Sequence, residues 1–273
     1  MKRTLRDKKI FQKIIFNFDN FWKHFLNFKF SLFYLKEKTM AHTINFKKTT
    51  IDLIRRLTAI NPAILIEKDS DKISIKSSDA SGSVAYMFEA PSDHFGFDGD
   101  EVGFLDFNEF HQLLNVYKEP TITQDDNDAL DLIISEKRSK ISYRLTNSEV
   151  IKRGFNEIEF GDSDVEFIIT SDDVKHLNKM ISLVNAESIK ISVLDKKVKF
   201  TLFSKKSSNT FEEVYDAETT NGSEFDINIT KDTFAMLPAD NYRISAKEEG
   251  IVRLSMIRED DSIVNIYIAE ENG

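Results

Sequence analysis

Cationic side chains gather on one short segment of the sequence. Residues 47–60 hold four Lys or Arg and one Asp, which gives this segment a net charge of +3. Its apolar residues recur at helical spacing: Leu53, Ile54, Leu57 and Ile60. Lys48, Arg55 and Arg56 fall largely on the opposite side of the predicted helix. A helix with such a face is suited to contact a phosphate backbone, although an ordinary solvated face with ion pairs has the same pattern.

Further cations are weaker candidates for phosphate contact. The segment at residues 171–185 also has helical periodicity, and Lys175 and Lys179 lie opposite its apolar side. The remaining candidates lie on less regular elements: Lys118, Lys152, Arg153 and Lys231. We expect all of them to contribute less than Arg55 and Arg56.

Other chemistries find little support in the residue types. The chain has no cysteine, which excludes disulfides, thiol catalysis and zinc-thiolate sites. The acidic run at residues 125–128 lacks the glycine that a calcium-binding EF-hand loop needs. The histidines show no metal-ligand spacing, and we expect His111 and His176 to be exposed helix residues. We therefore predict no catalytic residue, no metal site and no cofactor.

The elements that position the cations occur twice. A helix at residues 48–60 turns at once into a strand, and the same order returns about 120 residues later. Each half is predicted as a helix, four strands, a second helix and three strands. We predict an α+β fold of two tandem copies, with antiparallel sheets and two helices per domain on one face. The hydroxyls of Thr49 and Thr50 are expected to cap the first helix, and Asn108 the second.

The predicted domains are residues 40–155 and 156–273, joined through a polar connector at residues 146–164. Residues 1–39 form a basic, Phe-rich extension with ten Lys or Arg and three Asp or Glu. Three interpretations of the extension stay open. It is translated from a region upstream of a true start at Met40, it is a basic amphipathic helix on an anionic membrane surface, or it is a helix docked on the body. Charged residues interrupt its apolar runs, so we do not expect it to span a bilayer.

The charge is divided unevenly between the extension and the body. Residues 40–273 hold 27 Lys or Arg and 43 Asp or Glu, a balance of −16. Such an acidic body argues against a domain that coats DNA with its whole surface. The cationic helix at residues 48–60 therefore stands out against its surroundings.

Three passages resemble a known family. They are TTIDLIRRLTAINPAILI at residues 49–66, VGFLDFNEFHQLLNV at residues 102–116 and FDINITKDTFAMLPADNYRI at residues 225–244. From Met40 onward the chain resembles the processivity sliding clamp of T-even-type bacteriophages, within the DNA-clamp superfamily. The resemblance depends on several weak matches in the right order and on the duplication.

The resemblance implies a non-catalytic ring of three identical subunits around duplex DNA, with the helices lining the hole. It also implies two protein partners, a replicative DNA polymerase and an ATP-driven clamp loader, in the cytoplasm of an infected bacterial host. By the family's topology, the late strands of the first domain meet the strand at residues 210–218 of a neighbour. The candidate contacts are Ile141, Tyr143, Phe211, Val214 and Tyr215.

The connector is more apolar than a solvated linker needs to be. We expect Phe155 and Phe160 to pack the seam between the domains, and Val150, Ile151 and Ile158 to form the rim of a partner pocket. A buried apolar anchor from a polymerase tail would supply most of the affinity there.

Two alternatives belong to other functional classes. A duplicated, β-rich phage structural or assembly scaffold without DNA encirclement would also be acidic and free of cysteine. A carboxylate-based hydrolase would need a concave pocket with converging carboxylates of perturbed pKa.

Overall fold

The computed structural model describes residues 42–124, 130–152, 155, 158–194, 196–204 and 206–271. The extension at residues 1–39, the acidic run at residues 125–128 and Arg153 lie outside the described residues. The compact unit that carries the fold spans His42–Gly273.

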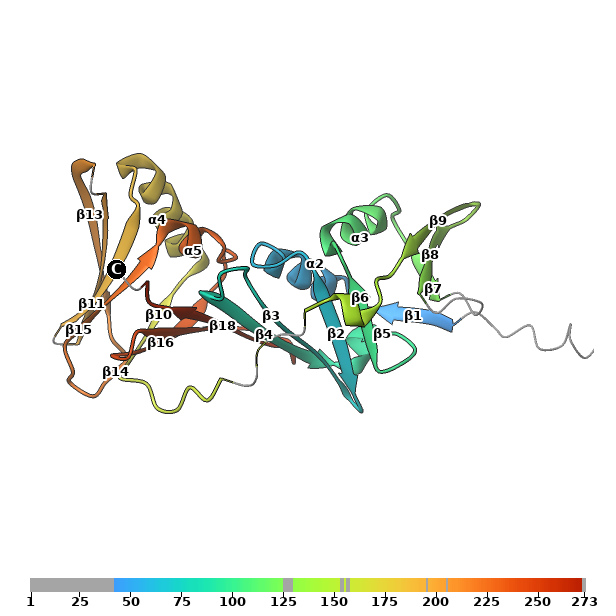
Figure 1. Ribbon diagram of the computed structural model, residues 1–273, viewed down its shortest axis with the longest axis horizontal. Helices are drawn as coiled ribbons and strands as arrows, with labels where there is room; N and C mark the ends of the chain where they lie inside the picture. The colour runs from blue at the N-terminus through green and yellow to red at the C-terminus, as the bar shows by residue number, and fades with distance from the viewer. Residues whose placement is uncertain are drawn as a thin grey trace, which may run out of the picture. The chain divides into compact units, whose positions relative to one another are not determined.

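The first half of the chain alternates short helices with antiparallel strands (Figure 1). Its main elements are β1 (His42–Phe46), α2 (Lys48–Leu57), β2 (Ile64–Asp69), β3 (Lys72–Ser78), β4 (Val84–Pro91), β5 (Phe95–Gly96), β6 (Glu101–Phe104), α3 (Phe107–Leu114), β7 (Thr121–Gln124), β8 (Asp131–Glu136) and β9 (Ser139–Arg144). Two 3-10 turns, η1 (Ser92–His94) and η2 (Ser148–Val150), complete it.

The second half repeats this order. Its elements are β10 (Val165–Ile169), α4 (Ser171–Val184), β11 (Ser188–Leu194), β12 (Lys197–Ser204), β13 (Ser207–Asp216), β14 (Thr219–Thr220), β15 (Phe225–Thr230), α5 (Lys231–Ala235), β16 (Tyr242–Lys247), β17 (Ile251–Met256) and β18 (Ile263–Ala269). Even the shortest strands correspond, because β5 pairs with β1 and β14 pairs with β10. The prediction of two tandem α+β copies is confirmed, whereas the exact domain boundaries stay a prediction.

Three sheets contain the described strands. The largest has the order β14-β10-β16-β17-β18-β4-β3-β2-β6, so it runs through both halves. Strands β18 and β4 join the halves in an antiparallel register from Ile263 opposite Glu89 to Ile268 opposite Val84. The other sheets have the orders β5-β1-β7-β8-β9 and β13-β12-β11-β15. Strands β9 and β13 therefore lie at sheet edges.

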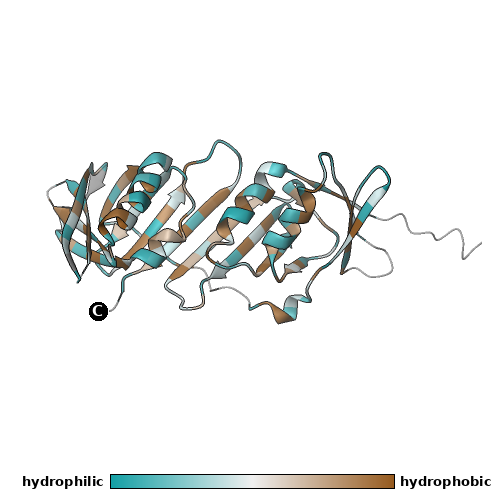
Figure 2. Ribbon diagram, turned by 90° about the horizontal axis from the view of Figure 1, so that it is seen from above, coloured by the Kyte–Doolittle hydropathy of each residue, from teal (hydrophilic) through white to brown (hydrophobic). Residues whose placement is uncertain are grey.

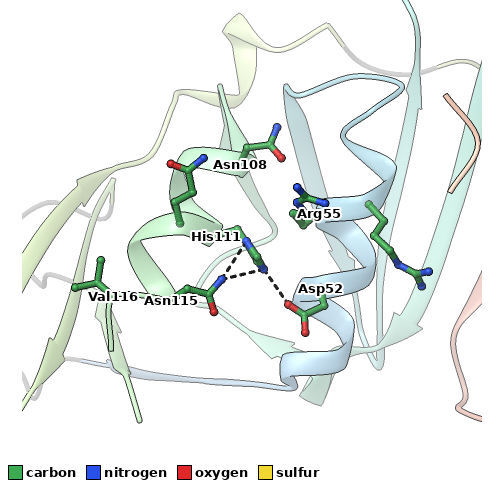
Figure 3. A pocket seen from close by; sticks show the side chains of 8 residues that line it. Asp52, Arg55, Asn108, His111, Asn115 and Val116 are labelled. Carbon is green, nitrogen blue, oxygen red and sulfur yellow. Dashed lines mark hydrogen bonds and ion pairs between the residues drawn. The ribbon is translucent and has the colours of Figure 1, made fainter. Parts of the chain in front are cut away.

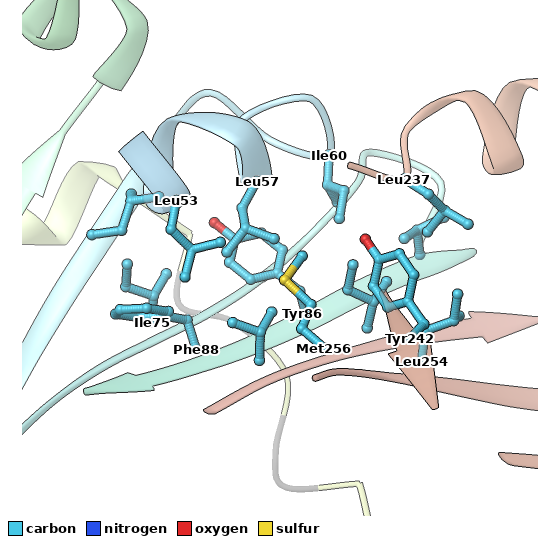
Figure 4. Close-up of a cluster of buried hydrophobic side chains, with 14 of the residues drawn as sticks. Leu53, Leu57, Ile60, Ile75, Tyr86, Phe88, Leu237, Tyr242, Leu254 and Met256 are labelled. Atoms are coloured by element: carbon cyan, nitrogen blue, oxygen red, sulfur yellow. The ribbon is translucent and has the colours of Figure 1, made fainter. Parts of the chain in front are cut away.

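The helices lie on one side of the strands, and Figure 2 shows them in front of the strands when the molecule is seen from above. Each helix buries its apolar stripe against the sheets, as Leu53 and Leu57 of α2 and Leu177 of α4 do. Between the halves, Leu57, Tyr86 and Met256 belong to one buried cluster (Figure 4). Burial of a side chain of this size contributes about 1.5–3 kcal/mol, so the shared cluster holds both copies to the common sheet.

Several helix boundaries differ from the prediction by a few residues, and hydrogen bonds explain two of the differences. Helix α2 ends at Leu57 and not at residue 60, and the Thr58 hydroxyl donates to the carbonyl oxygen of Arg55. Helix α3 begins at Phe107, one residue before the predicted start at Asn108, because the Asp106 carboxylate accepts a hydrogen bond from the backbone N–H of Asn108 and so caps the helix. The side chain of Asn108, the predicted cap, instead contacts the same hydroxyl, with its Oδ1 2.8 Å from Thr58 Oγ1.

Candidate nucleic-acid interface

Helix α2 is held by its buried face and not by its N-terminal cap. Leu53 and Leu57 are almost completely buried, whereas the N-cap residue Lys47 makes no side-chain capping bond. Arg55 and Arg56 occupy the last turn, where a cation interacts favourably with the negative end of the helix dipole. The prediction of an amphipathic helix with a cationic face is confirmed.

The predicted capping role of Thr49 and Thr50 is wrong. Thr50 is buried, and its Oγ1 lies 3.0 Å from Nδ1 of the buried His94. The Nζ of Lys47 contacts the other ring nitrogen, Nε2. An ammonium group only donates, so Nε2 accepts and Nδ1–H donates to the Thr50 hydroxyl. The start of α2 is therefore fixed by the His94 side chain of η1, which lies 44 residues after Thr50 in the sequence.

A groove of about 550 Å³ lies between α2 and α3 on the side of the molecule that carries the helices (Figure 3). Seven of its eight lining residues have polar side chains, and most of them come from these two helices: Asp52, Arg55, Arg56, Asn108, His111, Gln112, Asn115 and Val116. Only one of these side chains is a carboxylate, so the groove does not offer the converging carboxylates that hydrolysis would need. Amide and guanidinium donors of this kind can instead bind phosphate oxygens.

A histidine–carboxylate pair bridges the two walls of the groove. His111 Nε2 of α3 lies 2.8 Å from Asp52 Oδ1 of α2, and Asn115 Nδ2 lies 3.2 Å from the His111 ring (Figure 3). The His111 side chain is only 18% exposed, which corrects the prediction that it is an exposed helix residue. The pair ties α2 to α3 and shields part of the single negative charge in the groove.

Arg55 and Arg56 are adjacent in sequence but differ in their surroundings. Arg55 is exposed beside the groove, whereas Arg56 Nη2 lies 2.9 Å from Asp240 Oδ2 in the second half of the chain. Asp240 also faces Arg258, whose guanidinium forms two hydrogen bonds to Asp260. These bonds hold the pKa of Asp260 well below its ordinary value of 3.8. Arg56 is thus part of a charge-balanced network that links the halves.

The other predicted cations are spread over the same elements. Lys48 and Lys118 are exposed and line a small hollow next to the groove. Lys175 is exposed but pairs with Asp172 at 3.0 Å within α4, and Lys179 on α4 is exposed. The last two described candidates, Lys152 and Lys231, are exposed as well. The structure brings Lys48, Arg55 and Lys118 towards the α2–α3 region and leaves Lys175, Lys179 and Lys231 in the second half.

The predicted subunit contacts lie on two edge strands. On β13, Val214 is 55% exposed, whereas Phe211 and Tyr215 are half-buried against the core. On β9, Ile141 is half-buried, but Tyr143 is only 6% exposed. Tyr143 packs on Phe104 and Phe110, and its hydroxyl donates to the Asp106 carbonyl. Tyr143 is therefore a core residue and not an exposed apolar contact.

The predicted partner pocket is only partly accessible. Val150 is 68% exposed and Ile158 is half-buried, but Ile151 is 6% exposed. A Cβ placed on Gly103 would approach the Thr146 carbonyl oxygen to 2.7 Å and Ile151 Cδ1 to 2.9 Å, so glycine is required where the connector and the Ile151 side chain pack on β6. Ile151 is thus removed from the rim.

The two connector phenylalanines pack as predicted. The rings of Phe155 and Phe160 both lie against Tyr267 of β18, and the Arg253 guanidinium lies 4.4 Å from the Phe160 ring centroid. The cation–π contact adds to the burial of Phe160. Phe155 and Phe160 therefore hold this part of the connector against β18 of the nine-stranded sheet.

Sequence reasoning missed the pairs that join separate segments: Asp52–His111, Thr50–His94 and Arg56–Asp240. A weak signal existed for the first, because Asp52 and His111 both lie on the polar sides of their helices. Among the described residues, no group of three or more His, Cys, Asp or Glu could hold a metal ion. No helix in this part of the chain is long and apolar enough to cross a membrane.

Several solved structures share this architecture. The Proliferating Cellular Nuclear Antigen (PCNA) of Entamoeba histolytica matches with a TM-score of 0.66 at 15% identity, over 85% of this chain and 100% of that one. A. fulgidus PCNA, solved with the C-terminal region of FEN-1, matches with a TM-score of 0.67 at 12% identity, over 86% and 99%. The chain has the sliding-clamp fold. PCNA from Thermococcus kodakaraensis is similar to the same degree, with a TM-score of 0.65 at 14% identity over 84% and 99%.

The sequence comparisons add no family assignment to the clamp fold. No family model matches the chain, and no curated protein matches it significantly. Identities of 12–15% establish the fold alone. The expectation of a DNA-clamp fold is confirmed, and the narrower expectation of a T-even-type phage clamp stays a prediction.

Proposed function

We propose that this chain is a non-catalytic sliding clamp that encircles duplex DNA and tethers a replicative DNA polymerase for processive synthesis. The observation that carries the proposal is the exposed cationic end of α2, on the side that bears the helices, in an acidic chain with the clamp fold. Arg55 is exposed at this end, next to a groove lined mainly by polar side chains, and Lys48 is exposed at the opposite end of the helix. Phosphate contact through such residues carries no sequence information, which suits movement along DNA.

The acidic body supports the same function for an electrostatic reason. Residues 40–273 carry a balance of −16, so most of the surface repels a phosphate backbone. A chain that binds DNA only through one small cationic region holds it loosely. Loose contact within a closed ring would combine long retention with free sliding.

We further propose a ring of three identical subunits of the T-even phage type, closed by the edge strands β9 and β13 of neighbouring copies. The loading partner would be an ATP-driven clamp loader, and the location would be the cytoplasm of an infected bacterial host. The polymerase would bind through a short tail with an apolar anchor near Val150 and Ile158, which remain partly accessible. The solved complex of A. fulgidus PCNA with the C-terminal region of FEN-1 supports tail binding by analogy of fold.

A retention experiment tests the proposal. The protein is mixed at low salt with a linear duplex plasmid, so that a ring can thread over the free ends. Half of the sample is then closed into circles with ligase and half is left linear, and the DNA is separated from free protein by gel filtration. We expect retention on the circle and loss from the ends of the linear form, together with a trimeric mass by light scattering. Equal retention on both forms would indicate simple surface binding. A monomer that binds neither form would favour the scaffold alternative.

A further inference from the structure

One titratable pair lies within the groove between α2 and α3, and the proposed DNA contact does not use it. His111 Nε2 lies 2.8 Å from Asp52 Oδ1, and Asn115 Nδ2 lies 3.2 Å from both nitrogens of the His111 ring (Figure 3). The Asp52 side chain is 50% exposed, whereas the His111 side chain is 18% exposed. A ligand that enters the groove therefore meets the carboxylate and lies close to the imidazole.

The Asp52 carboxylate is unfavourable at a site for phosphate. It is the only carboxylate among the residues that line the groove. Arg55 lies three residues further along α2, so it projects beside Asp52 on the helix surface. Repulsion between Asp52 and a phosphate offsets part of the attraction that Arg55 exerts. The groove therefore binds phosphate best when the charge of Asp52 is neutralised.

His111 can supply this neutralisation by changing its own charge. With a neutral ring, the Asp52–His111 pair carries a net charge of −1. With a protonated ring, the pair carries no net charge, and its hydrogen bond is charge-assisted at both ends. Histidine is the side chain whose charge changes between pH 5 and 8, so a small change in its surroundings decides between the two states.

Charges on both helices and on the segment after α3 act on the ring. Besides Asp52, the titratable and charged side chains that line the groove and the adjoining hollow are Lys48, Arg55, Arg56, Tyr117 and Lys118. In the absence of DNA, the cations oppose a further positive charge on His111. A phosphate bound among them adds negative charge and so favours the protonated ring. Phosphate and proton therefore favour each other's binding, as linkage requires.

Asn115 can adapt to either state of the ring. A carboxylate only accepts, so Nε2 of His111 carries a hydrogen towards Asp52, and the lone pair of the neutral ring lies on Nδ1. The amide nitrogen of Asn115 can donate to this lone pair at 3.2 Å. After protonation, a half-turn of the Asn115 amide presents its carbonyl oxygen to Nδ1–H. The amide N–H groups of this exposed residue then point away from the ring, where they can donate to a phosphate oxygen.

We infer that His111 is a DNA-binding residue that takes up a proton from solvent when a backbone phosphate enters the groove. The inference rests on the proposed function and adds a residue and a proton to its DNA contact. The proton binds Nδ1, the positive charge cancels that of Asp52, and Arg55 then acts on the phosphate without opposition. Release of the DNA returns the proton to solvent, so no bond in DNA forms or breaks.

The pH dependence of DNA binding tests the inference. Anisotropy of a rhodamine-labelled linear duplex at low salt measures the affinity, since this dye does not titrate near neutral pH. We expect wild type to bind roughly three- to tenfold more tightly at about pH 6 than at about pH 8, the size of one charge–charge contact near a protein surface. His111→Gln keeps a hydrogen-bond donor for Asp52 but cannot take up a proton, so its affinity should change little with pH. Wild-type pH dependence in this variant, or none in wild type, would overturn the inference.

Two further variants separate the charge of the pair from other effects. His176→Gln is the matched control, because His176 is an exposed histidine on α4 in the second half, and it should keep the wild-type pH dependence. Asp52→Asn removes the opposing charge and should bind DNA roughly tenfold more tightly than wild type at about pH 8. Equal or weaker binding by Asp52→Asn would contradict the inference, as would loss of the pH dependence in His176→Gln.

Calorimetry on the wild type completes the test even if a variant fails to fold. The heat of duplex binding near neutral pH, measured in buffers with different ionisation enthalpies, gives the number of protons taken up. We expect net uptake by wild type and by His176→Gln, and close to none by His111→Gln. Binding without uptake would overturn this inference and leave the proposed function intact. Wild type that binds duplex at no pH would instead overturn the proposed function, so the two failures are distinguishable.

Discussion

Helices α2 and α4 occupy equivalent places in the two halves but are stabilised in different ways. Helix α4 begins with a capping box, in which Thr170 and Asp173 satisfy each other's backbone N–H groups, and it ends at Asn185 in the left-handed conformation. Helix α2 has no side-chain cap and no acidic residue in its first turn. It begins instead at Lys47 and Lys48, although cations are unfavourable at the positive end of the helix dipole.

This difference shows that α4 follows the usual sequence preferences for helix ends, whereas α2 departs from them and depends on tertiary contacts. Helix α4 satisfies the ordinary rules for helix ends within its own sequence, and its Lys175 pairs with Asp172. Helix α2 obtains its stability from buried side chains and from the Thr50–His94 contact. A helix that breaks local rules while its tertiary contacts hold it is typical of a functional site. The comparison therefore supports α2 as the main cationic contact in the proposed clamp.

The largest expected effect tests the dependence of α2 on burial. Leu57→Ala should lower the free energy of unfolding by about 2–5 kcal/mol, because Leu57 is fully buried and the change leaves a cavity. Leu183→Ala on α4 is the matched control, since Leu183 is 62% exposed and should change stability by less than about 0.5 kcal/mol. Urea unfolding measures both variants. Equal small losses would contradict the view that tertiary packing holds α2.

The next effect separates the two helices in DNA retention. Arg55→Glu should weaken retention on circular DNA by roughly tenfold at low salt and reduce the slope of log affinity against log salt by about one. Lys179→Glu makes the same change of charge on exposed α4 and should have a smaller effect. Both variants should keep wild-type stability. A larger loss for Lys179→Glu would move the main contact to the second half.

A smaller effect concerns the helix caps. Thr170→Ala should cost about 1 kcal/mol, because it removes the side-chain acceptor of the α4 capping box. Thr49→Ala is the control on α2, where no side chain caps the helix, and it should be nearly neutral. Thermal unfolding distinguishes the two results. Equal losses would show that Thr49 has a role at the start of α2 that its exposed position does not explain.

The contrast between the helices also explains which features could be predicted from the sequence. The sequence predicts α4 to within one residue, because its apolar periodicity lies within the helix itself. Each element of the repeat can be predicted from its own segment in the same way, and their repeated order identifies the fold. Tyr143 was misassigned because periodicity places it on one face of β9 without saying that Phe104 and Phe110 cover that face. Ile151 packs against Gly103, which lies 48 residues earlier, and only the folded chain brings these two residues into contact.

Long-range polar pairs were beyond prediction for a similar reason. Arg55 and Arg56 are the same residue type, and the helical pattern places both of them largely outside the apolar face. Only the arrival of Asp240 from the second half separates an exposed cation from one that is already paired. The cationic helix was therefore recognised from the sequence, but the division of labour between its two arginines was not.

The smallest expected effect concerns the pH dependence of the charge network to which Arg56 and Asp240 belong. Arg258 holds the pKa of Asp260 below its ordinary value by hydrogen bonding, with further hydrogen bonds from Ser262. A carboxyl group whose folded-state pKa is lowered stabilises the protein fully above its unfolded pKa, near 4, and this contribution is lost as pH falls towards the folded value. We therefore expect the stability difference between wild type and Asp260→Asn to be largest at neutral pH and to shrink as pH falls below about 4.

The neighbouring Arg56–Asp240 pair allows the same experiment to test the link between the halves. Arg56→Gln should lower stability by about 0.5–1 kcal/mol, since the pair is partly exposed, whereas Arg55→Gln should be nearly neutral. For DNA retention the order should reverse, with the larger loss for Arg55→Gln. Urea unfolding and DNA retention, both measured on Arg55→Gln and Arg56→Gln, test whether the two orders are opposite. If Arg56→Gln weakens retention more without affecting stability, Arg56 leaves Asp240 to contact phosphate, and the two arginines act together in the proposed clamp.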